Sequence, residues 1–433
     1  FTVAVAVGTA LVFGLIPALR ATRVDPQAAM KGGGRGVLGG RHQLGKSLVV
    51  LQVALSLTLV AAAGLLVGSF RNLTQVNPGF QRNGVLLVRA GFAKAQSNLV
   101  AQTVAQAQLL DRLREMPAVR GAATALMTPI SGSGWNEFIQ VDGVKSAGRK
   151  NSVVWFNEVS AGYFSTMGTA LLSGRDFTRT DDGTAPAVAV VDEAMAHKFF
   201  GNASALGHTI ETNVGDSVSP PVTIVGVVRT AKYASLSEKS PGTVYLPFGQ
   251  GEQNAPTVNY VLRADGSPLA LIPLVKTAAA GMSPSITLEF TTLDAQVSSS
   301  LARPRLLATL SGFFGGLALL LATIGLYGMM SYDVTRRRNE IGIRIALGAA
   351  RPRVLGMVVA EAGRLVVLGV GVGLVLAIGT TRFVSSFVFG VTPTDPPTLA
   401  LASALLAVVA LAAALLPAWR AARVDPMNAL REE

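Results

Sequence analysis

Two short stretches of this sequence carry residue types that hold nucleotide phosphates in other proteins. Gly40–Ser47 reads GRHQLGKS and fits the pattern G-x-x-x-x-G-K-[ST], in which backbone N–H groups and the lysine bind phosphate. Ala187–Glu193 reads AVAVVDE, an apolar run that ends in two acids able to hold the accompanying Mg²⁺. Taken alone, the two stretches predict an enzyme that hydrolyses a nucleotide.

The surroundings of Gly40–Ser47 contradict that hypothesis. A phosphate loop lies between a strand and the N-terminus of a helix in a soluble sheet. Here the glycine-rich residues 32–36, typical of a flexible linker, precede the pattern, and the apolar residues 47–67 follow it. We therefore interpret the match as a coincidence, expect no enzyme activity and no directly bound cofactor, and assign Lys46 to the membrane surface.

Composition indicates a membrane protein. Half of the 433 residues are hydrophobic and only 14% are charged, whereas soluble domains carry roughly a quarter charged residues. The chain has no cysteine and only three widely separated histidines, so we predict neither catalytic nor metal-binding residues.

Five segments approach the roughly 20 apolar residues that a spanning helix requires: 1–19, 47–67, 306–330, 359–380 and 399–419. The fourth is the weakest, because Glu361 and Arg364 lie near its start; they could pair, or the span could begin at Leu365.

Basic residues predict which side of the membrane each loop occupies. Residues 20–46 hold six Lys and Arg, residues 333–353 hold six Arg, and residues 420–433 hold three Arg. The positive-inside rule places these stretches in the cytoplasm and residues 69–305 outside. The placement of these basic residues explains the net charge of +12 by membrane orientation. We therefore predict no nucleic-acid binding.

The two ends of the sequence repeat one another at an offset of 400 residues. Residues 13–30 read FGLIPALRATRVDPQAAM and residues 413–430 read AALLPAWRAARVDPMNAL. The matches include a proline, two arginines and the triplet Val-Asp-Pro. We interpret the repeat as a tandem duplication, in which residues 1–19 are the last span of a preceding unit.

The outer region predicts a mixed α+β domain. Helices are expected over 94–116, 269–280 and 292–302, and strands over 85–89, 153–159, 187–191, 222–228 and 260–262. We expect two lobes, the second formed by an insertion near residues 129–245.

A segment between two spans joins apolar and basic residues at helical spacing. Ile341, Ile345 and Leu347, with Val354 and Leu355, form one face, and arginines form the other. This pattern is typical of an amphipathic helix at the inner membrane surface, with Gly348 at its end and Arg351-Pro352 opening the next helix. Anchoring to anionic lipid is the simpler interpretation of these residues.

Residues 336–349, RRRNEIGIRIALGA, strongly resemble the coupling segment of FtsX/MacB-type ABC transporter permeases. Residues 162–177, 188–210 and 222–248 are similar to the external domain of that family. The terminal repeat resembles duplicated, acidobacterial-type orphan permeases, of which this chain would be the C-terminal half.

The resemblance implies an α-helical membrane protein: a four-span permease unit plus one preceding span, with a large α+β extracytoplasmic domain inserted after the first span of the unit. Its parts are a preceding span (1–19), a cytoplasmic linker (20–46), span 1 (47–68), a MacB-like domain (69–305), span 2 (306–332), the coupling segment (333–357), span 3 (358–381), an external loop (382–397), span 4 (398–419) and a cytoplasmic tail (420–433).

The resemblance also implies partners and contact residues. A separate cytoplasmic ABC ATPase dimer would use ATP, press on the coupling segment and move the external domain. The contact residues it implies are Arg338, Glu340, Ile341, Gly342, Ile343, Arg344, Leu347 and Gly348. The resemblance places the permease in the inner membrane. Further partners would be the lipid bilayer, a second permease unit (as the duplicated half or as a homodimer) and a periplasmic or outer-membrane protein.

Glycines at i and i+4 predict close packing between spans. Three pairs have this spacing: Gly64 and Gly68, Gly312 and Gly316, and Gly369 and Gly373.

Two functions follow from the resemblance. The leading one is export of an unidentified substrate, which the large outer domain favours. The alternative is an FtsX-like signal relay that activates an extracytoplasmic enzyme.

Overall fold

A computed structural model describes residues 35–93, 95, 98–142, 152–214, 217–218, 220–250, 256–347, 349–384, 388–392 and 394–423. The chain divides into two compact units, residues 1–69 with 307–433, and residues 70–306. The expected span over 1–19, the first copy of the terminal repeat, Gly348 and the second copy's Val-Asp-Pro triplet lie outside the described residues.

The first unit is a bundle of long apolar helices. Its elements are α4 (Arg35–Gln75), α10 (Ala302–Arg336), α11 (Arg338–Ala346), α12 (Arg351–Val384) and α13 (Pro396–Ala421). Among the described residues, four helices are long and apolar enough to cross a membrane, by length and composition. Each extends past its predicted apolar core. The added residues at the starts of α4 and α12 include lysine and arginine, which are good helix formers.

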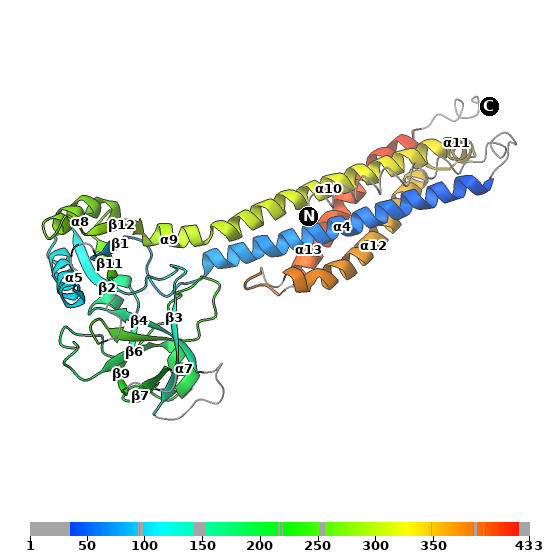
Figure 1. The fold of residues 1–433 in the computed structure, drawn as a ribbon. Coiled ribbons are helices and arrows are strands. Elements are labelled where there is room, and N and C mark those ends of the chain that lie inside the picture. The colour runs from blue at the N-terminus through cyan, green and yellow to red at the C-terminus, as the bar shows by residue number, and fades with distance from the viewer. Residues whose placement is uncertain are drawn as a thin grey trace. The chain divides into compact units, whose positions relative to one another are not determined.

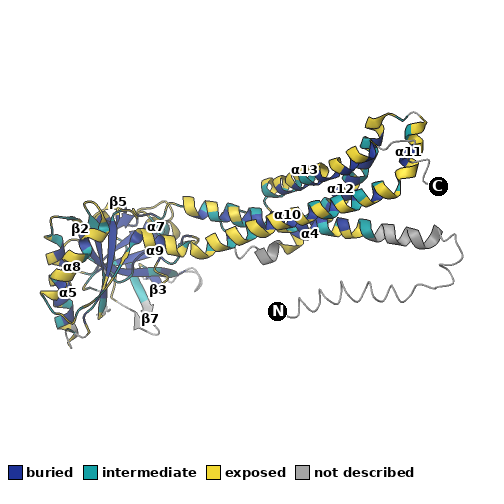
Figure 2. Cartoon of the chain, turned by 90° about the horizontal axis from the view of Figure 1, so that it is seen from above, coloured by how far each residue is buried: buried dark blue, intermediate teal, exposed yellow. Residues whose placement is uncertain are grey.

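Small residues let these helices approach closely. Figure 1 shows α4, α10, α12 and α13 side by side, and one hydrophobic core joins them. Leu57 and Leu326 are fully buried in this core, and α13 contributes a row of alanines to it, at 402, 410, 414, 418 and 421. The opposite faces of α10 and α13 are exposed, as the yellow residues in Figure 2 show.

The second unit is built on a 12-stranded sheet, with the order β10-β6-β9-β7-β3-β4-β2-β11-β1-β12; β5 pairs with β9, and β8 with β7. Pairing is antiparallel except between β4 and β10 and between β6 and β9. The strands are β1 (Val85–Gly91), β2 (Val119–Ala125), β3 (Trp135–Val141), β4 (Val153–Val159), β5 (Leu171–Gly174), β6 (Val188–Asp192), β7 (Thr209–Val214), β8 (Ser217–Val218), β9 (Val222–Val228), β10 (Thr243–Pro247), β11 (Thr257–Ala264) and β12 (Thr287–Thr292).

Helices cover this sheet around two hydrophobic cores. The helices are α5 (Leu99–Arg114), α6 (Tyr163–Met167), α7 (Glu193–Phe200), the short η3 (Pro268–Ala270), α8 (Leu271–Ala280) and α9 (Leu293–Ser300). One core packs α5 and α8 on β1, β2 and β11, and the other packs α7 on β4, β6, β9 and β10. The second core uses residues between 135 and 246, whereas the first draws on both flanking segments.

Candidate functional site

The predicted coupling segment forms a short helix held between two long ones. Arg337 separates α10 from α11, and its N–H donates to the Asp333 carbonyl at 3.1 Å. Ile341 of α11 is only 2% exposed and joins the bundle core with Val354 and Val358 of α12. Gly342 is buried as well. These two residues anchor α11 to the bundle and are not exposed, so their role as contacts for a partner stays a prediction.

The other face of α11 is open. Arg338, Glu340, Ile343 and Arg344 are exposed, and Leu347, which caps the helix, is 83% exposed. Leu347 therefore does not share the buried side of α11 with Ile341 and Ile345, which pack on the bundle core. At the C-terminal end the chain departs from helical geometry after Ala346, which carries the Leu347 side chain away from the core.

Charges on the open face form a local pair. The Arg344 guanidinium lies 2.6 Å from the Glu340 carboxylate, one helical turn away. At this spacing the pair stabilises the helix, and it leaves Ile343 and Leu347 as an apolar contact between charged neighbours.

A three-residue ion cluster connects α11 to the spans. Glu361 of α12 accepts hydrogen bonds from Lys46 of α4 and, at 3.1 Å, from Arg337 at the start of α11. All three side chains are partly buried. Since a partly buried pair is screened less than a surface pair, the cluster fixes three elements relative to one another.

The cavity beside this cluster is small. It measures about 20 Å³ and is lined by residues that include Met330, Asp333, Met357 and Glu361. That volume holds about one water molecule. The cluster is therefore a structural junction rather than a pocket for a ligand.

Two family descriptions match the two units. Residues 47–278 match the MacB-like periplasmic core domain, and residues 312–426 match the FtsX-like permease C-terminal domain. The first match covers more than half of the chain. This chain belongs to the MacB/FtsX family of ABC transporter permeases.

Relatives of this permease are export proteins or transporter permeases by name. The macrolide export ATP-binding/permease protein MacB of Chromobacterium violaceum is 29% identical over 64% of this chain and 43% of its own length. The uncharacterized ABC transporter permease YknZ of Bacillus subtilis is 27% identical over 64% of this chain and 70% of its own length. The chain thus spans less than half of the MacB protein, and it matches the family in its permease region. The relatives do not favour the signal-relay alternative.

A solved structure of the periplasmic region of MacB from Actinobacillus actinomycetemcomitans aligns with 53% of this permease and 97% of that chain. The TM-score is 0.35 and the sequence identity 16%.

The structure gives both nucleotide-like stretches of the permease another role. Residues 40–47 lie inside α4, where backbone N–H groups bond within the helix and cannot form a phosphate cradle. Asp192, the proposed Mg²⁺ ligand, is fully buried and caps α7: its carboxylate accepts from the N–H groups of Met195 at 2.8 Å and Thr243 at 2.9 Å. Burial raises the pKa of Asp192 to about 6, which the two backbone hydrogen bonds oppose.

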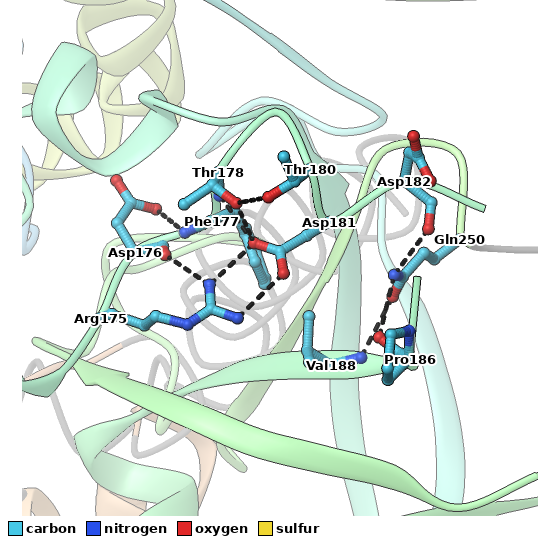
Figure 3. Close-up of polar contacts among 10 residues, drawn as sticks. All are labelled: Arg175, Asp176, Phe177, Thr178, Thr180, Asp181, Asp182, Pro186, Val188 and Gln250. Carbon is cyan, nitrogen blue, oxygen red and sulfur yellow. Dashed lines mark hydrogen bonds and ion pairs between the residues drawn. The ribbon is translucent and has the colours of Figure 1, made fainter. Parts of the chain in front are cut away.

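A polar loop follows β5 in the outer domain of the permease (Figure 3). Arg175 donates two hydrogen bonds to Asp181, at 2.8 and 2.9 Å, and Thr178 donates to the same carboxylate. Hydrogen bonds from Arg175 lower the pKa of Asp181 to about 2. Gln250 closes the loop by donating to the carbonyls of Asp182 and Pro186. The loop is thus held by hydrogen bonds among its own residues and Gln250. We interpret its similarity to the family's sequences as a feature of the fold.

The three glycine pairs differ in what they contact. A methyl group built on Gly373 would lie 2.9 Å from the Ala54 carbonyl, and one on Gly64 would lie 2.8 Å from Thr398, so both approach another helix. Gly68 has Val391 at 3.7 Å, and Gly369 has Val53 at 2.5 Å.

The pair Gly312 and Gly316 differs from the other two. Gly312 and Gly316 have no atom within 4 Å of a built methyl group among the described residues. Gly315 instead faces α4, at 3.1 Å from Ala63. Within the described residues α10 thus turns Gly315 toward α4, and a packing role for Gly312 and Gly316 stays a prediction.

Proposed function

We propose that this chain is the permease subunit of an ABC-type exporter in the inner membrane. Residues 70–306 would lie outside, and an ATPase dimer in the cytoplasm would hydrolyse ATP and drive the movement. The names of the relatives and the two family matches support this proposal.

The observation that carries the proposal is the two-sided burial of α11. One side is fixed to the bundle by Ile341 and by the junction at Glu361. The other side exposes Ile343 and Leu347 between Glu340 and Arg344. A partner that grips the open side can therefore move α4 and α12 through the anchored side.

Further partners follow from the same proposal. The exposed faces of α10 and α13 offer surface to the bilayer and to a second permease unit, either a duplicated half or another copy. A periplasmic or outer-membrane protein would receive the substrate from the outer domain.

Binding of candidate ATPases tests the contact. The full chain is reconstituted in nanodiscs, and ATPase affinity is measured for Ile343→Asp with Leu347→Asp. Removing two exposed apolar contacts and adding charge should weaken binding at least roughly tenfold, since central interface residues each contribute about 1–2 kcal/mol or more.

The matched control is Val100→Asp with Val104→Asp. These valines are also exposed and four residues apart, but on α5 of the outer domain. Unchanged ATPase binding in the α11 variant, or equal loss in the α5 variant, would rule out the proposed contact.

A further inference from the structure

The motif repeated at the two chain ends has no part in the coupling proposal. Its second copy contains Pro417, Arg420 and Arg423, at the cytoplasmic end of α13. Both arginines recur in the first copy as Arg20 and Arg23, while the aromatic Trp419 is replaced there by a leucine. The recurrence of both arginines suggests that their charges have a use.

The structure places these arginines against aromatic side chains. The Arg420 guanidinium donates to the Tyr327 hydroxyl of α10 at 3.1 Å. The Arg423 guanidinium lies over the Trp419 ring, 3.5 Å from its centroid. Within the described part of the chain, neither arginine forms an ion pair with a carboxylate, and both are exposed. Each therefore keeps donors available for an external anion.

An apolar surface lies next to the two charges. Leu416 precedes Arg420 by four residues on α13, and Ile324 precedes Tyr327 by three on α10, so each shares a helix face with its partner. The two apolar side chains are 55% and 58% exposed. They continue from the arginines toward the middle of the spans, where a hydrocarbon chain would lie.

We propose that Arg420 and Arg423 bind the phosphate headgroup of an anionic phospholipid, whose acyl chain lies along Leu416 and Ile324. Guanidinium groups match phosphate oxygens in geometry and charge. Basic sites between spans on the cytoplasmic side select anionic lipids, and tryptophan favours the membrane interface. Trp419 and Tyr327 hold the two guanidinium groups in place for this contact.

Trp419 also reports on the site. The chain has three tryptophans, and the other two, Trp135 and Trp155, belong to the outer domain. In a Trp135→Phe, Trp155→Phe background, the full chain is placed in vesicles of phosphatidylcholine with a minority of phosphatidylglycerol. In two parallel samples, bromine is placed on the acyl chains of one lipid or of the other, and quenching of Trp419 fluorescence is measured in each.

Brominated phosphatidylglycerol should quench Trp419 more than its mole fraction predicts, with a preference of roughly fivefold per arginine and up to roughly thirtyfold for the pair. Arg420→Gln with Arg423→Gln should reduce the preference to about that of bulk lipid. Removing two charges elsewhere, by Arg71→Gln with Arg303→Gln, should leave it unchanged. Equal quenching by both lipids in the unsubstituted site would overturn the proposal.

Native mass spectrometry of the chain with all tryptophans intact provides a second measurement, should the phenylalanine background not fold. Fewer retained phosphatidylglycerol molecules in the Arg420/Arg423 variant support the site, and equal numbers oppose it. Inorganic phosphate at millimolar concentration should not abolish the quenching preference; abolition would identify a free-phosphate site instead. If the same variant loses ATPase binding but keeps its lipid preference, the surface belongs to the protein partner and the proposal fails.

Discussion

Individual acids in this permease serve the fold through their surroundings. Asp192 resembles a magnesium ligand in sequence, yet its carboxylate lies in the core and receives two backbone N–H groups. Glu361 looks misplaced in an apolar span, yet it receives Lys46 and Arg337. In both residues, the hydrogen-bond donors around the carboxylate give it a structural role.

Asp192 predicts a pH dependence of stability. Burial raises its pKa to about 6 in the fold, against about 3.9 in an unfolded chain. The native state therefore binds more protons between these values, and its stability falls as pH rises through that window, by about 2–3 kcal/mol.

Asp192→Asn retains an acceptor for Met195 and Thr243 but cannot titrate. Unfolding of the outer domain, followed by tryptophan fluorescence of the full chain, should show a difference between variant and wild type that grows from pH 4 to pH 6, with the variant more stable at pH 7. A difference that is constant with pH would contradict the assigned cause.

Sequence patterns predicted the helices and strands whose local composition gives a clear signal. The strands over 153–159 and 222–228 and the start of α12 at Arg351 agree with the structure. β2 was missed because its sequence, VRGAATA, is rich in glycine and alanine, and β12 was missed because its alternating exposure gives a weak apolar signal. The ion cluster could not be predicted, since Lys46 and Glu361 lie 315 positions apart.

Close packing of α12 on α4 predicts that Gly373 tolerates no large side chain. Gly373→Leu should lower the stability of the bundle by about 1–3 kcal/mol, because added volume forces two helices apart. Gly312→Leu is the matched control, since a methyl group there meets open space. Thermal unfolding in nanodiscs compares the two. Equal stability of the two variants would show that the observed approach of α12 to α4 does not limit the bundle.

In the whole molecule, contact with a cytoplasmic ATPase requires one orientation in the membrane. The basic stretches and the periplasmic family match both place residues 70–306 outside. The division of the chain into a helical unit and a sheet-based unit can be predicted from composition alone. The side of α10 that faces the bundle cannot, because it depends on packing across the bundle.

The absence of native cysteine makes this orientation testable. Thr180→Cys, in the outer domain, should react with a membrane-impermeant maleimide added outside intact cells. Ala350→Cys, between α11 and α12, should react only after the membrane is opened. Both residues are exposed. Reversed labelling of the pair would exclude the assigned topology.

In the proposed function, α11 passes movement of an ATPase to the spans through Glu361. Stimulation of ATP hydrolysis by the full chain in nanodiscs tests it most directly, with Glu361→Gln compared with Glu289→Gln, an exposed acid of the outer domain. We expect the Glu361 variant to bind the ATPase with unchanged affinity but to lose most of the stimulation, since the open face of α11 is intact while the junction is broken. Full stimulation by the Glu361 variant, or equal loss in the Glu289 variant, would contradict the account.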